Sequence, residues 1–123
     1  MIGPEDLAYV LTERSRVALI ERRFESAVEY ADAAFGSVGT DGLEAARALF
    51  VKGRALSELH RTRAARDVLE EAAMLFGKHE ARQQEASCWR EVGELLLAGG
   101  DLPGAVEALR SGLEALNPSR SRA

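Results

Sequence analysis

Apolar side chains recur every three or four positions along most of the chain, which is the spacing of amphipathic helices. No segment alternates apolar and polar residues in the way that a half-buried strand does. Glycine, proline and short polar stretches divide the pattern into six segments. The sequence therefore predicts an all-α fold, with helices over about 5–20, 24–35, 41–60, 62–76, 79–98 and 102–116.

Helix-end signals support these boundaries. Asp41 and Glu44 have the spacing of a capping box at the start of the third helix, and Gly77 ends the fourth. Asp101 caps the sixth helix, whose first turn tolerates Pro103. Because short turns join the helices, we expect one domain over 1–123 with antiparallel hairpins at about 5–37, 41–76 and 79–117, followed by a flexible tail at 118–123.

The second helix of each expected hairpin carries small residues at matching positions, which reveals an internal repeat. The repeat spacing is 38 residues from Ala27 to Ala65 and 40 residues from Ala65 to Ala105. Such a period is typical of stacked helix pairs. The superposed positions are Ala27, Ala31 and Ala34, then Ala65, Leu69 and Ala72, then Ala105, Leu109 and Gly112.

The third copy resembles the tetratricopeptide repeat (TPR) family. It carries Trp89, Val92, Gly93 and Leu96 on its first helix, and Ala105, Leu109 and a late Pro118 on its second. The second copy matches through Leu49, Gly53 and Leu56, with Lys52 in a usually apolar position, and in the first copy Ser15 replaces the glycine. The resemblance implies a short right-handed α-solenoid of three hairpins. Spacings above the family's usual length of about 34 predict extended helices at the start of the third hairpin.

Small residues at the repeat signature predict a close approach of two helices within each hairpin. We expect Gly53 to lie opposite Ala65, and Gly93 opposite Ala105. Trp89 is expected to belong to the core rather than to a ligand platform.

Composition narrows the classes of partner. The net charge of −4 and the pI near 5.3 give no general attraction to nucleic acid or to an anionic membrane. A single cysteine, Cys88, excludes an internal disulfide, and with no signal or spanning segment this favours a reducing cytoplasm. The excess of arginine over lysine suggests a GC-rich bacterial genome.

The residues that invite catalysis or metal binding are His60, His79 and Cys88. On one helix, the nine residues from His79 to Cys88 span about 13 Å, too far for a shared zinc ion. Cys88 is expected to be a small packing residue. The chain has no Gly-rich phosphate loop and no Ser-centred elbow, so we expect neither enzyme activity nor a cofactor or metal.

The TPR resemblance implies a concave groove lined by the first helix of each hairpin, where the family binds protein or peptide segments. Arginines among these positions suit an acidic partner. The alternative is that they are solvated or paired with Glu44, Glu58 and Glu94. The implied groove residues are Tyr9, Thr12 and Arg16, then Arg47, Phe50, Arg54 and Ser57, then Ser87, Arg90 and Glu94.

Three functional hypotheses follow. The first is an adaptor module that holds an acidic peptide in the groove. The second is the repeat portion of a bacterial helix-turn-helix regulator, which the run from Cys88 to Glu91 resembles. The third is self-association into a homodimer through uncapped end faces. Against the third, the last helix can cap itself by turning four leucines inward, which are Leu102, Leu109, Leu113 and Leu116.

Overall fold

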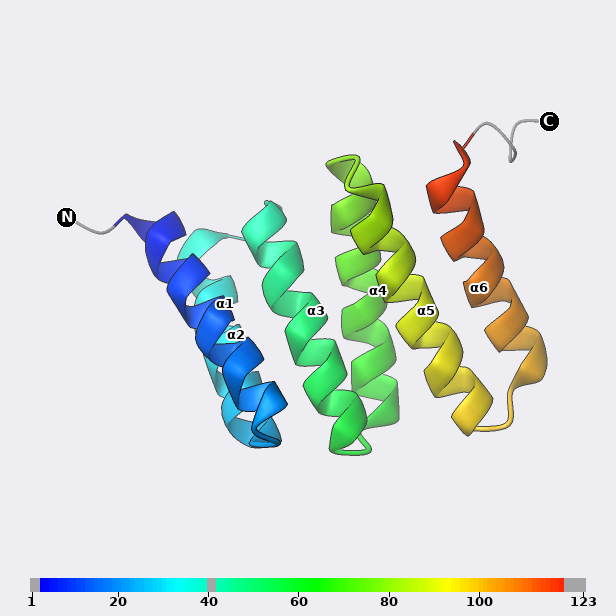
Figure 1. Ribbon diagram of the computed structural model, residues 1–123, viewed down its shortest axis with the longest axis horizontal. Helices are drawn as coiled ribbons and strands as arrows, with labels where there is room; N and C mark the ends of the chain where they lie inside the picture. Colours follow the sequence, from blue (N-terminus) through cyan, green and yellow to red (C-terminus); the bar gives the residue numbers. More distant parts are fainter. Residues whose placement is uncertain (1–2, 40–41, 119–123) are drawn as a thin grey trace.

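A computed structural model of the protein describes residues 3–39 and 42–118, and within these ranges the chain forms six α-helices and no strand (Figure 1). The predicted all-α class is therefore confirmed. The helices are α1 (Pro4–Ile20), α2 (Phe24–Val38), α3 (Leu43–Glu58), α4 (Thr62–Lys78), α5 (Arg82–Ala98) and α6 (Leu102–Leu116).

Helices that are consecutive in the sequence pack against each other, so the chain advances from one end of the molecule to the other (Figure 1). The pairs α1–α2, α3–α4 and α5–α6 are antiparallel hairpins, and α2 packs on α3 as α4 packs on α5. In addition α1 contacts α3, and α3 contacts α5. The first helices of the three hairpins therefore lie on one side of the molecule.

Six of the twelve predicted helix ends agree with the structure, and the other six differ by one to three residues. α2 continues through Gly36 to Val38, three residues beyond its predicted end. α3 begins at Leu43 after an N-cap at Gly42, and the predicted cap Asp41 lies outside the described residues. α4 continues through Gly77 to Lys78. The predicted extension at the start of α5 is wrong, because residues 79–81 form a turn and the added length is shared by α4 and α5, with 17 residues each. The cap of α6 is confirmed, since the Asp101 carboxylate accepts a hydrogen bond from the Gly104 N–H at 2.9 Å.

Four of the connections between helices are the same tight turn. In each, one residue adopts a left-handed backbone conformation, with φ of 63° at Arg22, 61° at His60, 58° at Glu80 and 84° at Gly100. The following N–H donates to a carbonyl five residues earlier, as in the 2.8 Å bond from Ala81 to Phe76, and this closes the last turn of the helix. One turn type therefore sends the chain back on itself both within and between hairpins, except at the α2–α3 connection.

The core consists largely of alanine with a few larger side chains. One cluster joins α3, α4 and α5 around Leu49, Phe76 and Cys88, and another joins α4, α5 and α6 around Leu69 and Val92. Trp89 is partly buried against both clusters, in agreement with its predicted core role. Because these clusters cross from one hairpin to the next, each hairpin is stabilised by its neighbours.

The two signature glycines lie where helices of one hairpin approach closely. A Cβ atom on Gly53 would lie 2.5 Å from Cγ of Leu69, and one on Gly93 would lie 3.0 Å from Cδ2 of Leu109. Gly93 also approaches Ala105 as predicted, with 3.6 Å between its added Cβ and the Ala105 carbonyl oxygen. The nearest atoms to Gly53 belong to Leu69 rather than to the predicted Ala65, because the leucine one turn further along α4 fills the space that the glycine leaves.

In the first hairpin, different residues form the close contact between the two helices. Ser15, at the position of the two glycines, is fully buried, and its Oγ donates a 2.6 Å hydrogen bond to the carbonyl oxygen of Ala27. Ala31 occupies the position that Leu69 and Leu109 hold in the other hairpins. A larger residue on one helix is thus balanced by a smaller residue on the other.

The prediction that α6 turns its leucines inward is wrong. Leu102, Leu109, Leu113 and Leu116 are exposed, and the buried residues of α6 are small ones: Ala105, Ala108, Gly112 and Ala115. Small side chains let the α6 backbone lie close to α5, and this turns Leu102, Leu113 and Leu116 toward solvent. Leu109 contacts Gly93 of α5 and remains 40% exposed.

Adding one methyl group tests the close approach. We expect Gly53→Ala to lower the free energy of unfolding by about 1–3 kcal/mol, and Gly93→Ala to cost less because its nearest contact is longer. Gly36→Ala is the matched control. It has no atom within 4 Å of the added Cβ, so its gain in helix propensity should stabilise the protein by about 0.5–1 kcal/mol. Urea unfolding measures all three variants, and a Gly53→Ala variant as stable as Gly36→Ala would contradict the packing described.

Candidate functional site

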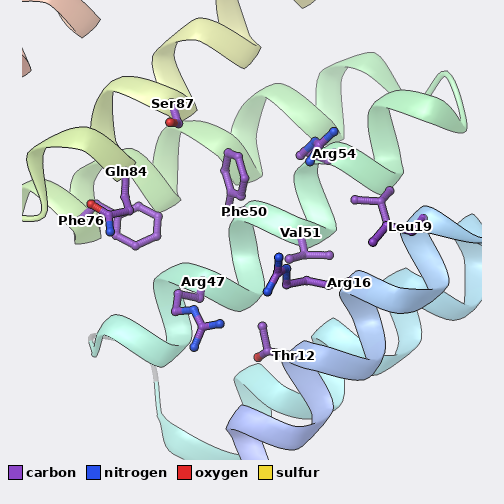
Figure 2. A pocket seen from close by; sticks show the side chains of 11 residues that line it. Thr12, Arg16, Leu19, Arg47, Phe50, Val51, Arg54, Phe76, Gln84 and Ser87 are labelled. Atoms are coloured by element: carbon purple, nitrogen blue, oxygen red, sulfur yellow. The ribbon is translucent and has the colours of Figure 1, made fainter.

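A cleft of about 350 Å³ opens on the side of the molecule formed by α1, α3 and α5 (Figure 2). Six of the predicted groove residues line it, which are Thr12, Arg16, Arg47, Phe50, Arg54 and Ser87. The remaining wall consists of Leu19, Ile20, Val51, Phe76 and Gln84. The structure thus brings most of the predicted residues of α1 and α3 together in one cavity.

Helical spacing explains how these side chains meet. On α3, Arg47, Phe50 and Arg54 are three and four residues apart, so they share one face of the helix. On α1, Thr12 and Arg16 are likewise four residues apart and face α3 (Figure 2). The cleft is therefore built on rigid helices rather than on loops.

The floor of the cleft is apolar. Val51 and Phe76 are buried, and Phe50 is partly buried against two core clusters. The sequence analysis did not place Phe76 here, because it belongs to α4, a second helix of a hairpin. It could have found Gln84, which lies three residues before Ser87 on the same helix.

The arginines at the rim of the cleft each face a carboxylate. Nη1 of Arg16 lies 2.9 Å from Oε2 of Glu13, and Nη1 of Arg47 lies 2.8 Å from Oε1 of Glu44. Nη2 of Arg47 is also 3.8 Å from Oε1 of Glu13. The alternative of paired arginines is therefore confirmed for Arg47 and Glu44, while Glu13 is a partner that the sequence analysis missed.

Arg54 forms its ion pair across two hairpins. Its Nε lies 3.7 Å from Oε1 of Glu91 on α5, rather than beside the expected Glu58 or Glu94. Burial raises the pKa of Glu91 above its usual range, and the neighbouring Arg54 guanidinium partly opposes that rise. The Glu91 carboxyl group therefore lies in a partly desolvated position, where Arg54 is its main attractive neighbour.

Four predicted groove residues lie outside the cleft. The ring of Tyr9 packs under Arg47, whose guanidinium carbon lies 5.3 Å from the ring centroid, so Tyr9 holds an arginine of the rim. Arg90 lines a second groove, between α5 and α6. Ser57 is half-buried near the end of α3, and Glu94 is exposed on α5. Neither of the last two borders the cleft.

Thr12 is an unusual part of the cleft wall. Its side chain is fully buried, and its Oγ1 has no hydrogen-bond partner among the described residues. A buried hydroxyl without a partner costs about 1–3 kcal/mol relative to a paired one. A bound polar group that reached this oxygen would remove that cost.

The residues that suggested other chemistry have structural roles. Cys88 is fully buried in the core, and burial together with the carboxylates of Glu85 and Glu91 raises the pKa of its thiol to about 12. His60 holds the left-handed position of the α3–α4 turn. Within the described ranges, no group of three or more His, Cys, Asp or Glu side chains is placed to hold a metal ion.

Thiol reactivity tests the packing role of Cys88. At pH 8 the thiolate fraction should fall about a thousandfold below that of an ordinary cysteine, and the core should also block access. We expect iodoacetamide to modify Cys88 at least a hundredfold more slowly in the native protein than in urea. Mass spectrometry of timed samples gives both rates, and equal rates in the two states would show that the thiol is accessible.

Comparison with known proteins adds no family assignment. No family model matches the chain, and no curated protein matches it. None of the helices in the described part of the chain is long and apolar enough to cross a membrane. The inference about function therefore depends on the cleft and its residues.

Proposed function

We propose that this protein is a non-catalytic binding module, a short right-handed α-solenoid of three TPR-like hairpins that holds a peptide segment of a partner protein in the cleft. The observation that carries the proposal is the cleft itself, in which arginines surround an apolar floor. Concave sites with an apolar base and a few polar groups are the common form of binding site in proteins.

The size of the cleft favours one anchoring side chain. A volume of about 350 Å³ is at the small end of the usual range of ligand sites. An apolar side chain of the partner would contact Phe50 and Phe76 at the floor. Buried apolar anchors of this kind supply most of the affinity in many protein interfaces.

The rim selects acidic residues on either side of that anchor. The side chains of Arg16 and Arg54 are 54% and 49% exposed, and each guanidinium has more N–H donors than its single carboxylate partner uses. Because an incoming acid competes with Glu13 or Glu91, binding exchanges ion pairs more than it adds them. The proposal therefore predicts modest affinity with clear preference for peptides that combine an apolar anchor with flanking acids.

Fluorescence anisotropy with a labelled peptide library tests this proposal. The library places Leu, Phe or Met in the centre, flanked by Asp and Glu, by Ser, or by Lys. We expect the acidic set to bind best and the Arg16→Glu, Arg54→Glu double variant to weaken that binding at least tenfold.

The matched control is Arg63→Glu, Arg82→Glu, which changes the net charge equally at two exposed arginines outside the cleft. This control should bind within about twofold of the unmodified protein, since it leaves the cleft intact. The proposal fails if both double variants bind the acidic peptides equally well, or if no peptide set binds.

A further inference from the structure

The outer face of α6 carries a continuous row of exposed apolar side chains. Five residues, here called the α6 stripe, follow one another at spacings of four, three, four and three, the seam pattern of a pair of packed helices. They are Leu102, Val106, Leu109, Leu113 and Leu116, and they are 61%, 45%, 40%, 59% and 45% exposed. No other helix of the described chain lies beyond this face (Figure 1).

The repeat shows what kind of element covers such a face. Forty residues earlier, Leu69, Ala73 and Phe76 of α4 hold the positions of Leu109, Leu113 and Leu116, and they are 0%, 0% and 3% exposed. α5 covers them, running antiparallel to α4 after a three-residue turn. Three positions of the α6 stripe thus match a buried packing surface of α4 that an antiparallel helix covers. At the other two, Leu102 and Val106 are apolar where α4 has the exposed polar residues Thr62 and Arg66.

We propose that the covering helix is α6 of a second copy of this chain, so that two molecules form a twofold-symmetric dimer. The stripe extends equally on both sides of Leu109, seven residues to Leu102 and seven to Leu116. In an antiparallel pair centred on Leu109, Leu102 meets Leu116 of the other copy and Leu109 meets itself, while Val106 lies within one residue's rise of Leu113. Such self-complementarity is what a twofold interface requires.

The charges beside the stripe agree with this pairing. Arg110 lies at its solvent edge, where its Nη1 is 4.0 Å from Oε1 of Glu107 on the same helix. In the antiparallel arrangement, Arg110 of one copy lies within about one residue's rise of Glu107 of the other, on the same edge. Each dimer would therefore gain two reciprocal contacts of opposite charge.

Head-to-tail stacking of copies, with α1 on α6, is less suitable. Between α2 and α3, the Asp32 carboxylate and Lys52 Nζ form a 2.7 Å ion pair. At the two ends of the molecule, Arg110 of α6 holds the repeat position of Asp32, and Arg14 of α1 holds the repeat position of Lys52. Stacking in that way would replace an ion pair by two arginines, a repulsion that the symmetric pair avoids.

The dimer would leave the peptide cleft free, because none of the five stripe residues lines it. Leu109, Leu113 and Leu116 instead border the second groove, with Gln83 and Arg90 of α5. Two clefts in one assembly would bind a partner with two suitable segments more tightly than either cleft alone. Dimerisation itself does not depend on the proposed peptide binding, so the two can fail separately.

Sedimentation equilibrium of the full chain from 1 to about 200 µM tests the dimer. We expect a monomer–dimer equilibrium for the unmodified protein and at least a tenfold higher dissociation constant for Leu113→Glu. Met74→Glu is the matched control, since Met74 is an exposed apolar residue of α4 outside the stripe. A monomer throughout the range, an unchanged Leu113→Glu, or growth beyond dimers would each overturn the proposal.

Disulfide trapping tests the antiparallel register without disturbing the charge. In a Cys88→Ala background, Leu109→Cys should form an interchain disulfide on mild oxidation, because two copies of position 109 face each other. Leu102→Cys should not, since an antiparallel pair separates the two copies of position 102 by about 21 Å. Efficient trapping through position 102 would indicate a parallel pair and contradict the proposed register.

Discussion

The close approach of two helices within each hairpin is the contact on which the rest of this structure depends. In the second and third hairpins a glycine lies under a leucine, Gly53 under Leu69 and Gly93 under Leu109. In the first, Ser15 binds the Ala27 carbonyl directly, and an alanine replaces the leucine. Alanine fills most of the remaining core, so the helices are held by shape and dispersion at short range rather than by large interlocking side chains.

Two kinds of helix contact position the two proposed surfaces. The packing of α1 on α3, between hairpins, brings Arg16 and Arg54 to the border of one cleft. Within the third hairpin, small residues fill the inner face of α6, and most of its larger apolar side chains are exposed. The proposed peptide site therefore lies where hairpins meet, and the proposed dimer surface lies at the end of the third hairpin.

Local signals in the sequence were sufficient for the helices and the hairpins, because helical periodicity and turn residues act over a few positions. The sequence did not reveal which face of α6 is buried, because its small residues and its leucines both recur at helical spacing. Only the position of α5 decides which of the two sets is buried. Arg54 illustrates a second limit. Its partner Glu91 lies on another hairpin, and the rotation that faces Glu91 toward α3 also places Arg90 at a different groove.

The most direct test of the shared packing contact is a double-mutant cycle in the first hairpin that installs the residues of the other two. Ser15→Gly removes a buried hydrogen bond, and Ala31→Leu adds volume at a buried position that leucine holds in the other two hairpins, so each alone should lower the free energy of unfolding by about 1–3 kcal/mol. Together they recreate the glycine–leucine pair, and the account predicts that the double variant is more stable than the sum of the single effects by at least about 1 kcal/mol in urea unfolding. Additive losses would contradict the claim that the three hairpins are one packing unit.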